Sequence, residues 1–253
     1  MLSHDQVLRF HAEGFLTGLD AFNPAEAEEN RLTYAQMTEQ VGGDGYAING
    51  YHTSCRGIAR MALHPALLNA VESLIGPEFI AWGTHFFCKE PGDERRVSWH
   101  QDGPYWPLTP GTVTAWVAID DADAGNGAMR LIPGSHRHGI LRSRDSLENE
   151  SNVLWRTLDG VERFGEPVAN VLRAGQFSLH HDLMVHGSEP NRSARRRCGL
   201  TIRYAPITVR AVDPGWAANA LRCGGSASAP HWICHPLPAE DAVIRRTAII
   251  GAN

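Results

Sequence analysis

A series of short apolar segments between residues 79 and 204 constrains this chain to a fold built mainly of β-strands. The segments are rich in β-branched and aromatic residues, and pairs such as Pro91-Gly92 and Pro133-Gly134 close them with turn signals. They comprise 79–89, 112–119, 128–132, 169–172, 176–181 and 199–204. Because many short strands can bury a common core by packing as two sheets, the pattern predicts a β-sandwich or jelly roll.

The residues before this series are predicted to form helices. Ser3 with Gln6 makes a capping box, and Asn23 stands before a proline, which is the arrangement of a helix start. A further helix is expected to begin at Pro65 and to end at Gly76, with its leucines on one face. We therefore expect mainly β structure with flanking helices, which form a layer against the sheets.

The chain has 253 residues, a length that all-β folds often use as one domain. We expect a single domain, 1–253, made of a helical layer (about 1–78), a jelly-roll core (about 79–206) and a C-terminal tail (about 207–253). The charged stretch 142–167 is expected to form a crossover helix or a lid. The sequence contains no internal repeat that would suggest another organisation.

Composition excludes several classes of protein. The formal net charge is -5, whereas wholesale nucleic-acid binding needs a clustered positive surface. No run approaches the roughly 20 apolar residues that span a bilayer, and charged residues interrupt the start of the chain before a signal peptide can form. The five cysteines are odd in number and lack a C-x-x-C spacing, so no disulfide framework or cysteine zinc site is expected. A cytoplasmic protein fits this best.

The segment from Ser98 to Asp102 carries the strongest chemical signal. Side chains alternate along a strand, so His100 and Asp102 are predicted to point to the same face and to offer two adjacent metal ligands. A second histidine from a distant strand would complete the 2-His-1-carboxylate set that is typical of non-haem iron(II) oxygenases. With 13 histidines in the chain, a His-x-Asp pattern alone is a weak signal.

His186 is the predicted third ligand, because it opens a turn with glycine and serine that leads to the next strand. That strand is expected to begin at Arg197, whose planar guanidinium suits the far carboxylate of a dicarboxylic co-substrate. Gly199, Thr201 and Arg203 would share the face of Arg197 on this strand.

A rival set pairs His180 and Asp182 with His235, and Arg246 follows at the same interval. We favour the first set, because few strand-like segments separate the rival ligands and no comparable turn follows His235. The histidines expected to be structural are therefore His136, His138, His180 and His181.

Several motifs follow one another along the chain in a recognisable order and at recognisable spacing. They are Phe87-Cys88-Lys89-Glu90-Pro91-Gly92, Trp99-His100-Gln101-Asp102, Ala115-Trp116-Val117-Ala118-Ile119-Asp120, Asn126-Gly127-Ala128-Met129, Ile132-Pro133-Gly134-Ser135-His136, and His186-Gly187-Ser188 with Arg197. As a set they resemble the phytanoyl-CoA dioxygenase family of iron(II)- and 2-oxoglutarate-dependent oxygenases, over most of the chain up to Tyr204. The resemblance implies a double-stranded β-helix, a cupin-like jelly roll.

The resemblance also implies the cofactors and the residues that bind them. His100, Asp102 and His186 are implied to hold iron(II). The residues implied for 2-oxoglutarate are Arg197, Ser188, Trp116 and Lys89. Because Asp102 stands where related halogenases carry a small residue, hydroxylation of a small molecule is favoured, with O2 consumed and with succinate and carbon dioxide released.

The substrate side is less defined by the sequence. Tyr105 and Trp106 follow the metal motif directly and are expected either to form a substrate wall or to be core aromatics. Arg203 is expected to meet an anionic substrate or to form a structural ion pair. The tail after Pro206 is expected to shape the substrate side.

Other functions remain open at this stage. A cupin-like metal isomerase or a dioxygenase without 2-oxoglutarate would use the same fold, since jelly rolls host many chemistries. A non-catalytic ligand-binding descendant is a third reading. Within the favoured function, desaturation, epimerisation and ring formation are alternatives to hydroxylation.

Overall fold

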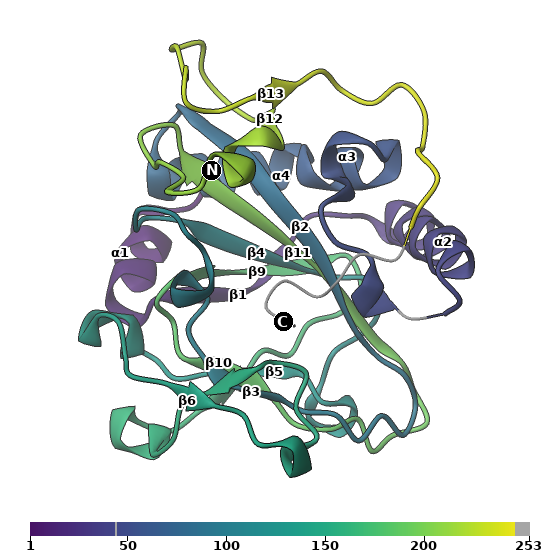
Figure 1. Ribbon diagram of the computed structural model, residues 1–253, viewed down its shortest axis with the longest axis vertical. Helices are drawn as coiled ribbons and strands as arrows, with labels where there is room; N and C mark the ends of the chain where they lie inside the picture. The colour runs from purple at the N-terminus through teal and green to yellow at the C-terminus, as the bar shows by residue number, and fades with distance from the viewer. Residues whose placement is uncertain (44, 246–253) are drawn as a thin grey trace.

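Two sheets face each other in the computed structural model, which describes residues 1–43 and 45–245 (Figure 1). The larger sheet contains, in spatial order, β1 (Phe15–Asp20), β9 (Gln176–His181), β4 (Val113–Ala118), β11 (Arg197–Pro206), β2 (Phe79–Lys89), β12 (Ala220–Arg222) and β13 (Cys234–His235). The smaller sheet contains β3 (Val97–His100), β10 (His186–Ser188), β5 (Met129–Leu131) and β8 (Val168–Ala169). Trp116 of β4 and Met129 of β5 belong to one buried cluster, so side chains of both sheets meet between them.

The predicted strands are confirmed where their apolar runs are long. β2 and β9 occupy the ranges that the sequence predicted, and β11 begins at Arg197, as expected. β8 is shorter and lies earlier than the predicted 169–172. The predicted class, mainly β with flanking helices, is confirmed.

The helices begin at the capping signals that the sequence contains. They are α1 (His4–Glu13), α2 (Pro24–Gln40), α3 (Arg56–Ala62) and α4 (Pro65–Ile75). Ser3 and Asn23 each form the predicted capping box, and Gly76 ends α4 with a φ of 81°. The 3-10 helices are η1 (Gly45–Ala47), η2 (Tyr51–Thr53), η3 (Gly103–Tyr105), η4 (Ala124–Asn126), η5 (Ser135–His138), η6 (Glu148–Glu150), η7 (Val161–Phe164) and η8 (Pro214–Ala218).

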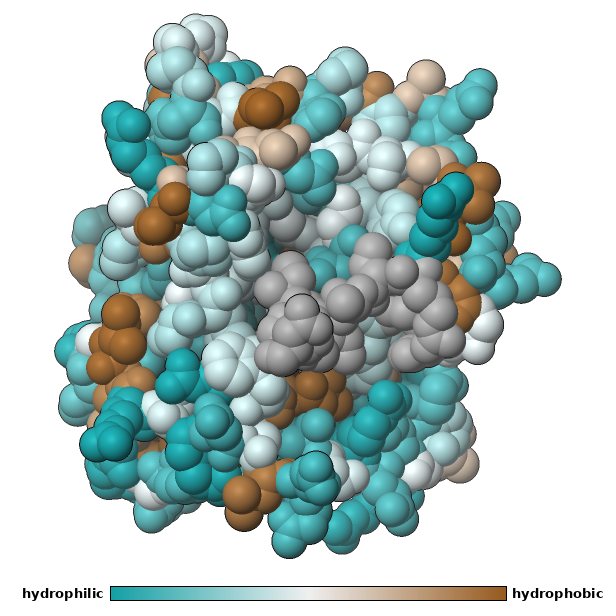
Figure 2. All heavy atoms as spheres, viewed as in Figure 1, coloured by the Kyte–Doolittle hydropathy of each residue, from teal (hydrophilic) through white to brown (hydrophobic). Residues whose placement is uncertain are grey.

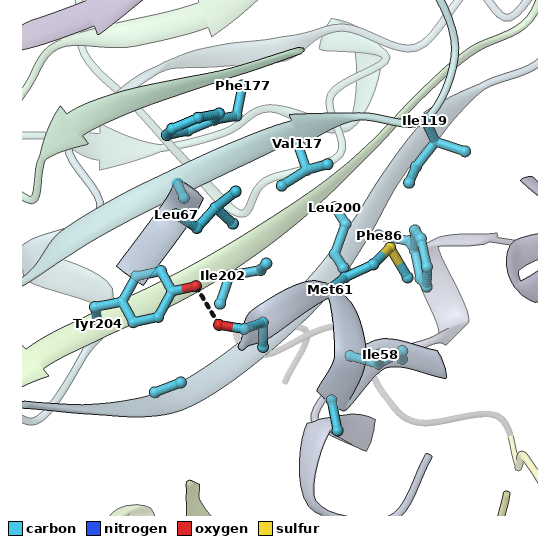
Figure 3. Packing of buried hydrophobic residues seen from close by; sticks show 14 of the residues in the cluster. Ile58, Met61, Leu67, Phe86, Val117, Ile119, Phe177, Leu200, Ile202 and Tyr204 are labelled. Atoms are coloured by element: carbon cyan, nitrogen blue, oxygen red, sulfur yellow. Dashed lines mark hydrogen bonds between the residues drawn. The ribbon is translucent and has the colours of Figure 1, made fainter. Parts of the chain in front are cut away.

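Helices α3 and α4 cover the outer face of the larger sheet (Figure 1). Ile58, Met61 and Leu67 pack there against Leu200 and Ile202 of β11, as Figure 3 shows. In the same layer the hydroxyl of Tyr204 donates a hydrogen bond to the carbonyl of Ala62 at 2.7 Å. This core fixes the larger sheet from behind and leaves its other face to the site.

The sequence suggested that the first third of the chain is helical, but it also contains a β-strand, β1. Gly14 ends α1 with a φ of 85°, and β1 follows at once as an edge strand of the larger sheet, paired with β9. Its partner lies some 160 residues further along the chain, and the strand contains Gly18 in a positive-φ conformation. Local sequence therefore contains little of the signal for this strand, and tertiary pairing determines it.

The stretch 142–167 contains no crossover helix. It contains the two-stranded ribbon of β6 (Arg144–Asp145) and β7 (Arg156–Thr157), with η6 and η7 around it. Ser98 Oγ donates to the carbonyl of Arg156 at 2.8 Å, so the ribbon lies beside β3, which carries His100. The helix prediction is wrong, and a role as a lid stays a prediction.

Two further features concern cysteines and the surface. Cys88 and Cys198 face each other across β2 and β11 and are joined by a disulfide, contrary to the expectation of none. None of the described helices is long and apolar enough to cross a membrane. On the face in Figure 2, brown hydrophobic residues are scattered among teal hydrophilic ones outside the atoms drawn in grey, which is ordinary for a protein surface.

Candidate active site

His100 and His186 lie opposite each other on neighbouring strands of the smaller sheet. β3 and β10 pair antiparallel with these two residues in register, and the ring centroids are 4.1 Å apart. Each Nδ1 contacts a main-chain carbonyl, Ser98 O at 2.7 Å for His100 and Met184 O at 2.9 Å for His186. Because a carbonyl oxygen only accepts, each Nδ1 carries a hydrogen, and in the neutral form of each ring Nε2 is the atom with a lone pair for a metal.

Asp102 reaches these imidazoles from beyond the end of β3. Its backbone is helical, with φ −70° and ψ −44°, so the prediction that it alternates with His100 along one strand is wrong. Its Oδ1 lies 3.4 Å from His100 Nε2 and 3.8 Å from His186 Nε2. Across residues 1–43 and 45–245, these three form the one group of His, Cys, Asp and Glu side chains that could share an ion, with ligand atoms within 4.8 Å of one another.

Burial and neighbouring charge give Asp102 and His186 the protonation states that a metal needs. Burial by itself raises the pKa of Asp102, but the imidazoles of His100 and His180 outweigh it and hold that pKa well below its ordinary value. Burial, with a smaller effect of His100, holds the pKa of His186 well below its ordinary value. The carboxylate is thus ionised and His186 neutral near pH 7, which is the state that binds divalent metals.

Thr114 and His180 contact the second oxygen of Asp102. Thr114 Oγ1 donates to Asp102 Oδ2 at 3.4 Å, and His180 Nε2 lies 3.5 Å from the same atom. The two residues pair directly across β4 and β9. They orient the carboxylate so that Oδ1 faces the imidazoles. The expectation that His180 is merely structural missed this position, although the alternation along β9 places it on the inner face.

The residues of the rival site are not brought together. Asp182 Oδ2 accepts from the backbone N–H groups of Gly111 and Thr112, and its Oδ1 lies 2.8 Å from His181 Nδ1. His235 is exposed on β13, 2.7 Å from the carbonyl of Ala218. Arg246 lies outside the described residues.

A cavity with about 420 Å³ of empty space adjoins the three candidate ligands. Its lining residues are Phe87, Val97, His100, Asp102, Trp116, Met129, His180, His186, Gly187, Ser188, Thr201 and Arg203. The walls therefore combine apolar side chains with a few convergent polar groups, as binding sites do.

Arg197 is buried behind this cavity and reaches it through Ser188. Its Nη1 donates to the carbonyl of Phe87 at 2.9 Å, and its Nη2 donates to Ser188 Oγ at 3.3 Å. Its Nε is buried without a hydrogen-bond partner, and no ion pair joins it to a carboxylate among the described residues. A buried cation without a counter-charge is costly, so the site fits an anionic ligand at this end.

Trp116 packs against this guanidinium, with its ring centroid 5.7 Å from Arg197 Cζ. The Trp116 ring lies over Gly199 of β11, which pairs with Ala118 of β4. A Cβ at position 199 would stand 2.0 Å from Trp116 Cζ2, so only glycine leaves room for the indole. The aromatic wall of the cavity therefore depends on a residue without a side chain.

The free energy of unfolding of the Gly199→Ala variant is expected to be lower by about 1–3 kcal/mol, because overpacking forces the Trp116 ring to move. It should also bind an anionic ligand at Arg197 more weakly, since the ring that packs on this guanidinium is displaced. Urea unfolding followed by tryptophan fluorescence measures the first effect. Gly83→Ala on the facing strand β2 is the matched control, because its Cβ would meet Arg203 only at 3.6 Å. Equal stability of the two variants would contradict this account.

Lys89, the last residue of β2, contacts the main chain around Ser188. Its Nζ donates to the main-chain carbonyls of Arg95, Ser188 and Glu189, and it is not among the lining residues of the cavity. Burial, and then the charge of Arg197, lowers the pKa of Lys89 to about 7. Its contacts hold the backbone of Ser188 in place.

The predicted substrate residues lie at the other end of the site. Tyr105 packs edge-on against His100, with centroids 5.9 Å apart, and its hydroxyl donates to the carbonyl of Arg156 at 3.2 Å. Trp106 is buried and has the guanidinium of Arg203 5.1 Å from its ring centroid. Tyr105 thus touches the candidate metal site, while Trp106 contacts Arg203.

Comparison with known proteins places this chain in a family. The family model Phytanoyl-CoA dioxygenase (PhyH) matches residues 19–199. The peroxisomal phytanoyl-CoA dioxygenase of Bos taurus is 29% identical over 156 residues, which cover 59% of this chain and 46% of that protein. L-proline trans-4-hydroxylase of Streptomyces griseoviridis is 28% identical over 193 residues, covering 66% and 70%. This chain spans about half the length of the bovine relative.

A solved structure described as "non-heme monooxygenase; ThoJ apo" superposes with a TM-score of 0.77. It is 30% identical and covers 93% of this chain and 89% of its own. The likeness extends over nearly the whole chain, so the predicted double-stranded β-helix is confirmed. With a family match over most of its length, the chain belongs to the phytanoyl-CoA dioxygenase family.

Proposed function

We propose that this protein is an Fe(II)- and 2-oxoglutarate-dependent dioxygenase that hydroxylates a C–H bond of a small molecule and releases succinate and carbon dioxide. The observation that carries the proposal is the convergence of two imidazole Nε2 atoms and one ionised carboxylate beside a cavity. The relatives named dioxygenase and hydroxylase support the same reaction class.

The donor set suits iron(II). Two neutral imidazoles and one carboxylate form the facial triad of non-haem iron oxygenases. His100, Asp102 and His186 would hold the metal. Iron(II) held this way, with 2-oxoglutarate and O2, would supply the oxidising power for C–H hydroxylation.

The other end of the cavity suits the distal carboxylate of 2-oxoglutarate. Arg197 would bind it through its guanidinium, assisted by the Ser188 hydroxyl 3.3 Å away. Trp116 would hold the guanidinium plane from the side, and Lys89 would fix the backbone of Ser188. Phe87, Met129 and Val97 would exclude water from the reactants, which strengthens these electrostatic contacts.

The alternatives each lack an observation of this kind. A dioxygenase or isomerase that does not use 2-oxoglutarate has no need of a buried, unpaired guanidinium at this position. A non-catalytic descendant has no need of an ionised Asp102 beside the Nε2 atoms of two imidazoles. Product analysis distinguishes hydroxylation from desaturation, epimerisation and ring formation.

We also propose that residues 1–253 form one catalytic domain, with the helical layer (about 1–78), the jelly-roll core (about 79–206) and the tail (about 207–253) on the substrate side. Pairing of β12 with β2 supports this, because the tail then shares a sheet with the core. Limited proteolysis that released a stable fragment would contradict it. A small molecule is the proposed partner.

The cytoplasm is the proposed compartment. Free thiols at Cys55, Cys223 and Cys234 and the need for iron(II) favour a reducing environment, whereas the Cys88–Cys198 disulfide opposes it. Cell fractionation against a cytoplasmic marker tests this.

Anaerobic titration of the apo-protein tests the proposed function. Addition of iron(II) and 2-oxoglutarate is expected to produce a visible charge-transfer band that neither produces alone, and admission of air should then release succinate. Iron binding without the band would favour a reaction that does not use 2-oxoglutarate. Failure to bind iron would leave only the non-catalytic reading.

A further inference from the structure

Arg203 is a buried cation that the proposed chemistry leaves without a partner. Only 6% of its surface is exposed, and it lines the cavity beside the candidate metal ligands. Its Nε is buried without a hydrogen-bond partner, and within 1–43 and 45–245 it forms no ion pair with a carboxylate. An unpaired buried guanidinium that lines a cavity indicates an anionic ligand.

The fold builds a specific setting for this guanidinium. The register of β2 and β11 shifts beside Arg203, which pairs with Gly83, while Tyr204 pairs with Ala81 and leaves Trp82 unpaired. The bulge places the Trp82 ring 5.7 Å from Arg203 Cζ, and the absent side chain of Gly83 leaves space next to it.

Aromatic rings hold the guanidinium in one orientation. Trp82 and Trp106 are perpendicular to each other with centroids 4.9 Å apart, and Arg203 contacts both rings. Trp232, from the C-terminal tail, belongs to the same buried cluster as these tryptophans. A cation fixed by packing loses little side-chain entropy when it binds a ligand, so the site is preorganised.

The co-substrate cannot serve Arg203 and Arg197 together. The two residues are six positions apart on β11, which corresponds to about 20 Å along an extended strand. A five-carbon dicarboxylate is much shorter than this. Arg203 instead pairs with Thr114, whose hydroxyl donates to Asp102, so it lies beside the candidate metal site.

The balance of charge indicates the class of anion. Iron(II) and Arg197 together neutralise Asp102 and the two carboxylates of 2-oxoglutarate. One positive charge then remains in the cavity, on Arg203. A monoanion such as a carboxylate would neutralise it, whereas a phosphate dianion would leave an excess negative charge, which is unfavourable in a buried site. A carboxylate also matches the planar fork of a guanidinium.

We propose that Arg203 binds the carboxylate of the prime substrate and that the substrates are small monocarboxylic acids. This inference rests on the proposed function, because the bound carboxylate would hold the acid next to the metal. Arg203 acts here as a specificity-determining residue.

Matched acid and amide pairs test the proposal without turnover. Benzoate and benzamide, phenylacetate and phenylacetamide, and octanoate and octanamide are titrated calorimetrically into anaerobic protein loaded with iron(II) and 2-oxoglutarate. In the wild type, at least one acid is expected to bind roughly 30-fold or more tightly than its amide, as expected for a buried charge-assisted pair. Arg203→Met should abolish this preference, and Arg203→Lys should retain part of it. Affinity for 2-oxoglutarate should stay unchanged in both variants.

Arg210→Met is the control, because it removes an exposed arginine and should keep the full preference. Wild-type protein that binds iron(II) and 2-oxoglutarate but prefers no acid over its amide, or binds none of the pairs, would overturn this inference alone. Persistence of the preference in Arg203→Met would overturn it as well. Absence of the charge-transfer band in the wild type would instead refute the proposed function.

Discussion

The His186→Ala variant is expected to bind iron(II) more than about 100-fold more weakly and to lose succinate formation as a result. Removing an outer residue that only orients a ligand already costs about 10- to 100-fold in metal affinity or activity, and His186 is proposed to contact the metal itself. The variant leaves two candidate ligands, His100 and Asp102, whose shared site is then open on one side. Iron content after gel filtration and the charge-transfer band with 2-oxoglutarate measure the loss.

His138→Ala is the matched control for this experiment. His138 is exposed in η5 and should tolerate replacement with full iron binding and activity. Circular dichroism of both variants confirms folding. A folded His186→Ala protein with wild-type iron affinity would show that the metal uses another ligand. His180 is then the first candidate, because its ring centroid lies 4.8 Å from that of His186.

The Arg197→Met variant is expected to bind 2-oxoglutarate roughly 30-fold or more weakly while binding iron(II) normally. Truncating one partner of a buried charge pair costs about 2–5 kcal/mol, and each 1.4 kcal/mol is a factor of ten in affinity. Methionine keeps much of the length and apolar volume of the side chain but removes its charge and its hydrogen bonds. The 2-oxoglutarate concentration at half-maximal charge-transfer absorbance measures the shift directly.

Arg196→Met provides a neighbouring control. Arg196 pairs with Asp120 at 2.7 Å, away from the cavity, so its loss should leave 2-oxoglutarate affinity unchanged. Equal weakening in both variants would indicate a general effect of positive charge near β11. Unchanged affinity in Arg197→Met would move the dicarboxylate elsewhere and weaken the proposed function.

Local signals in the sequence predicted much of the fold. Ser3 and Asn23 begin helices because their side chains satisfy backbone N–H groups that have no partner within the helix. The largely apolar run of β2 predicted a strand that is buried along most of its length. The edge strand β1 was missed, because its short sequence fits a strand only when β9 lies beside it.

The same division applies to the candidate site. Residue type and order alone indicated His100, Asp102 and His186 as ligands, because that chemistry needs those groups and little else. The sequence did not reveal how they meet: Asp102 leaves the strand and turns back, and the pairing of β3 with β10 sets the imidazoles together. Register between strands far apart in sequence depends on packing, which no local pattern encodes.

For residues outside any sequence motif, only the tertiary structure determined their place in the site. His180 lies against Asp102, and Trp82 lies against Arg203 because β2 is bulged at that point. The sequence by itself determined which side chains were available for iron and a dicarboxylate, together with the helices and long strands that carry them. The folded sheets determined which further side chains became buried without partners, because burial and pairing depend on contacts between distant segments.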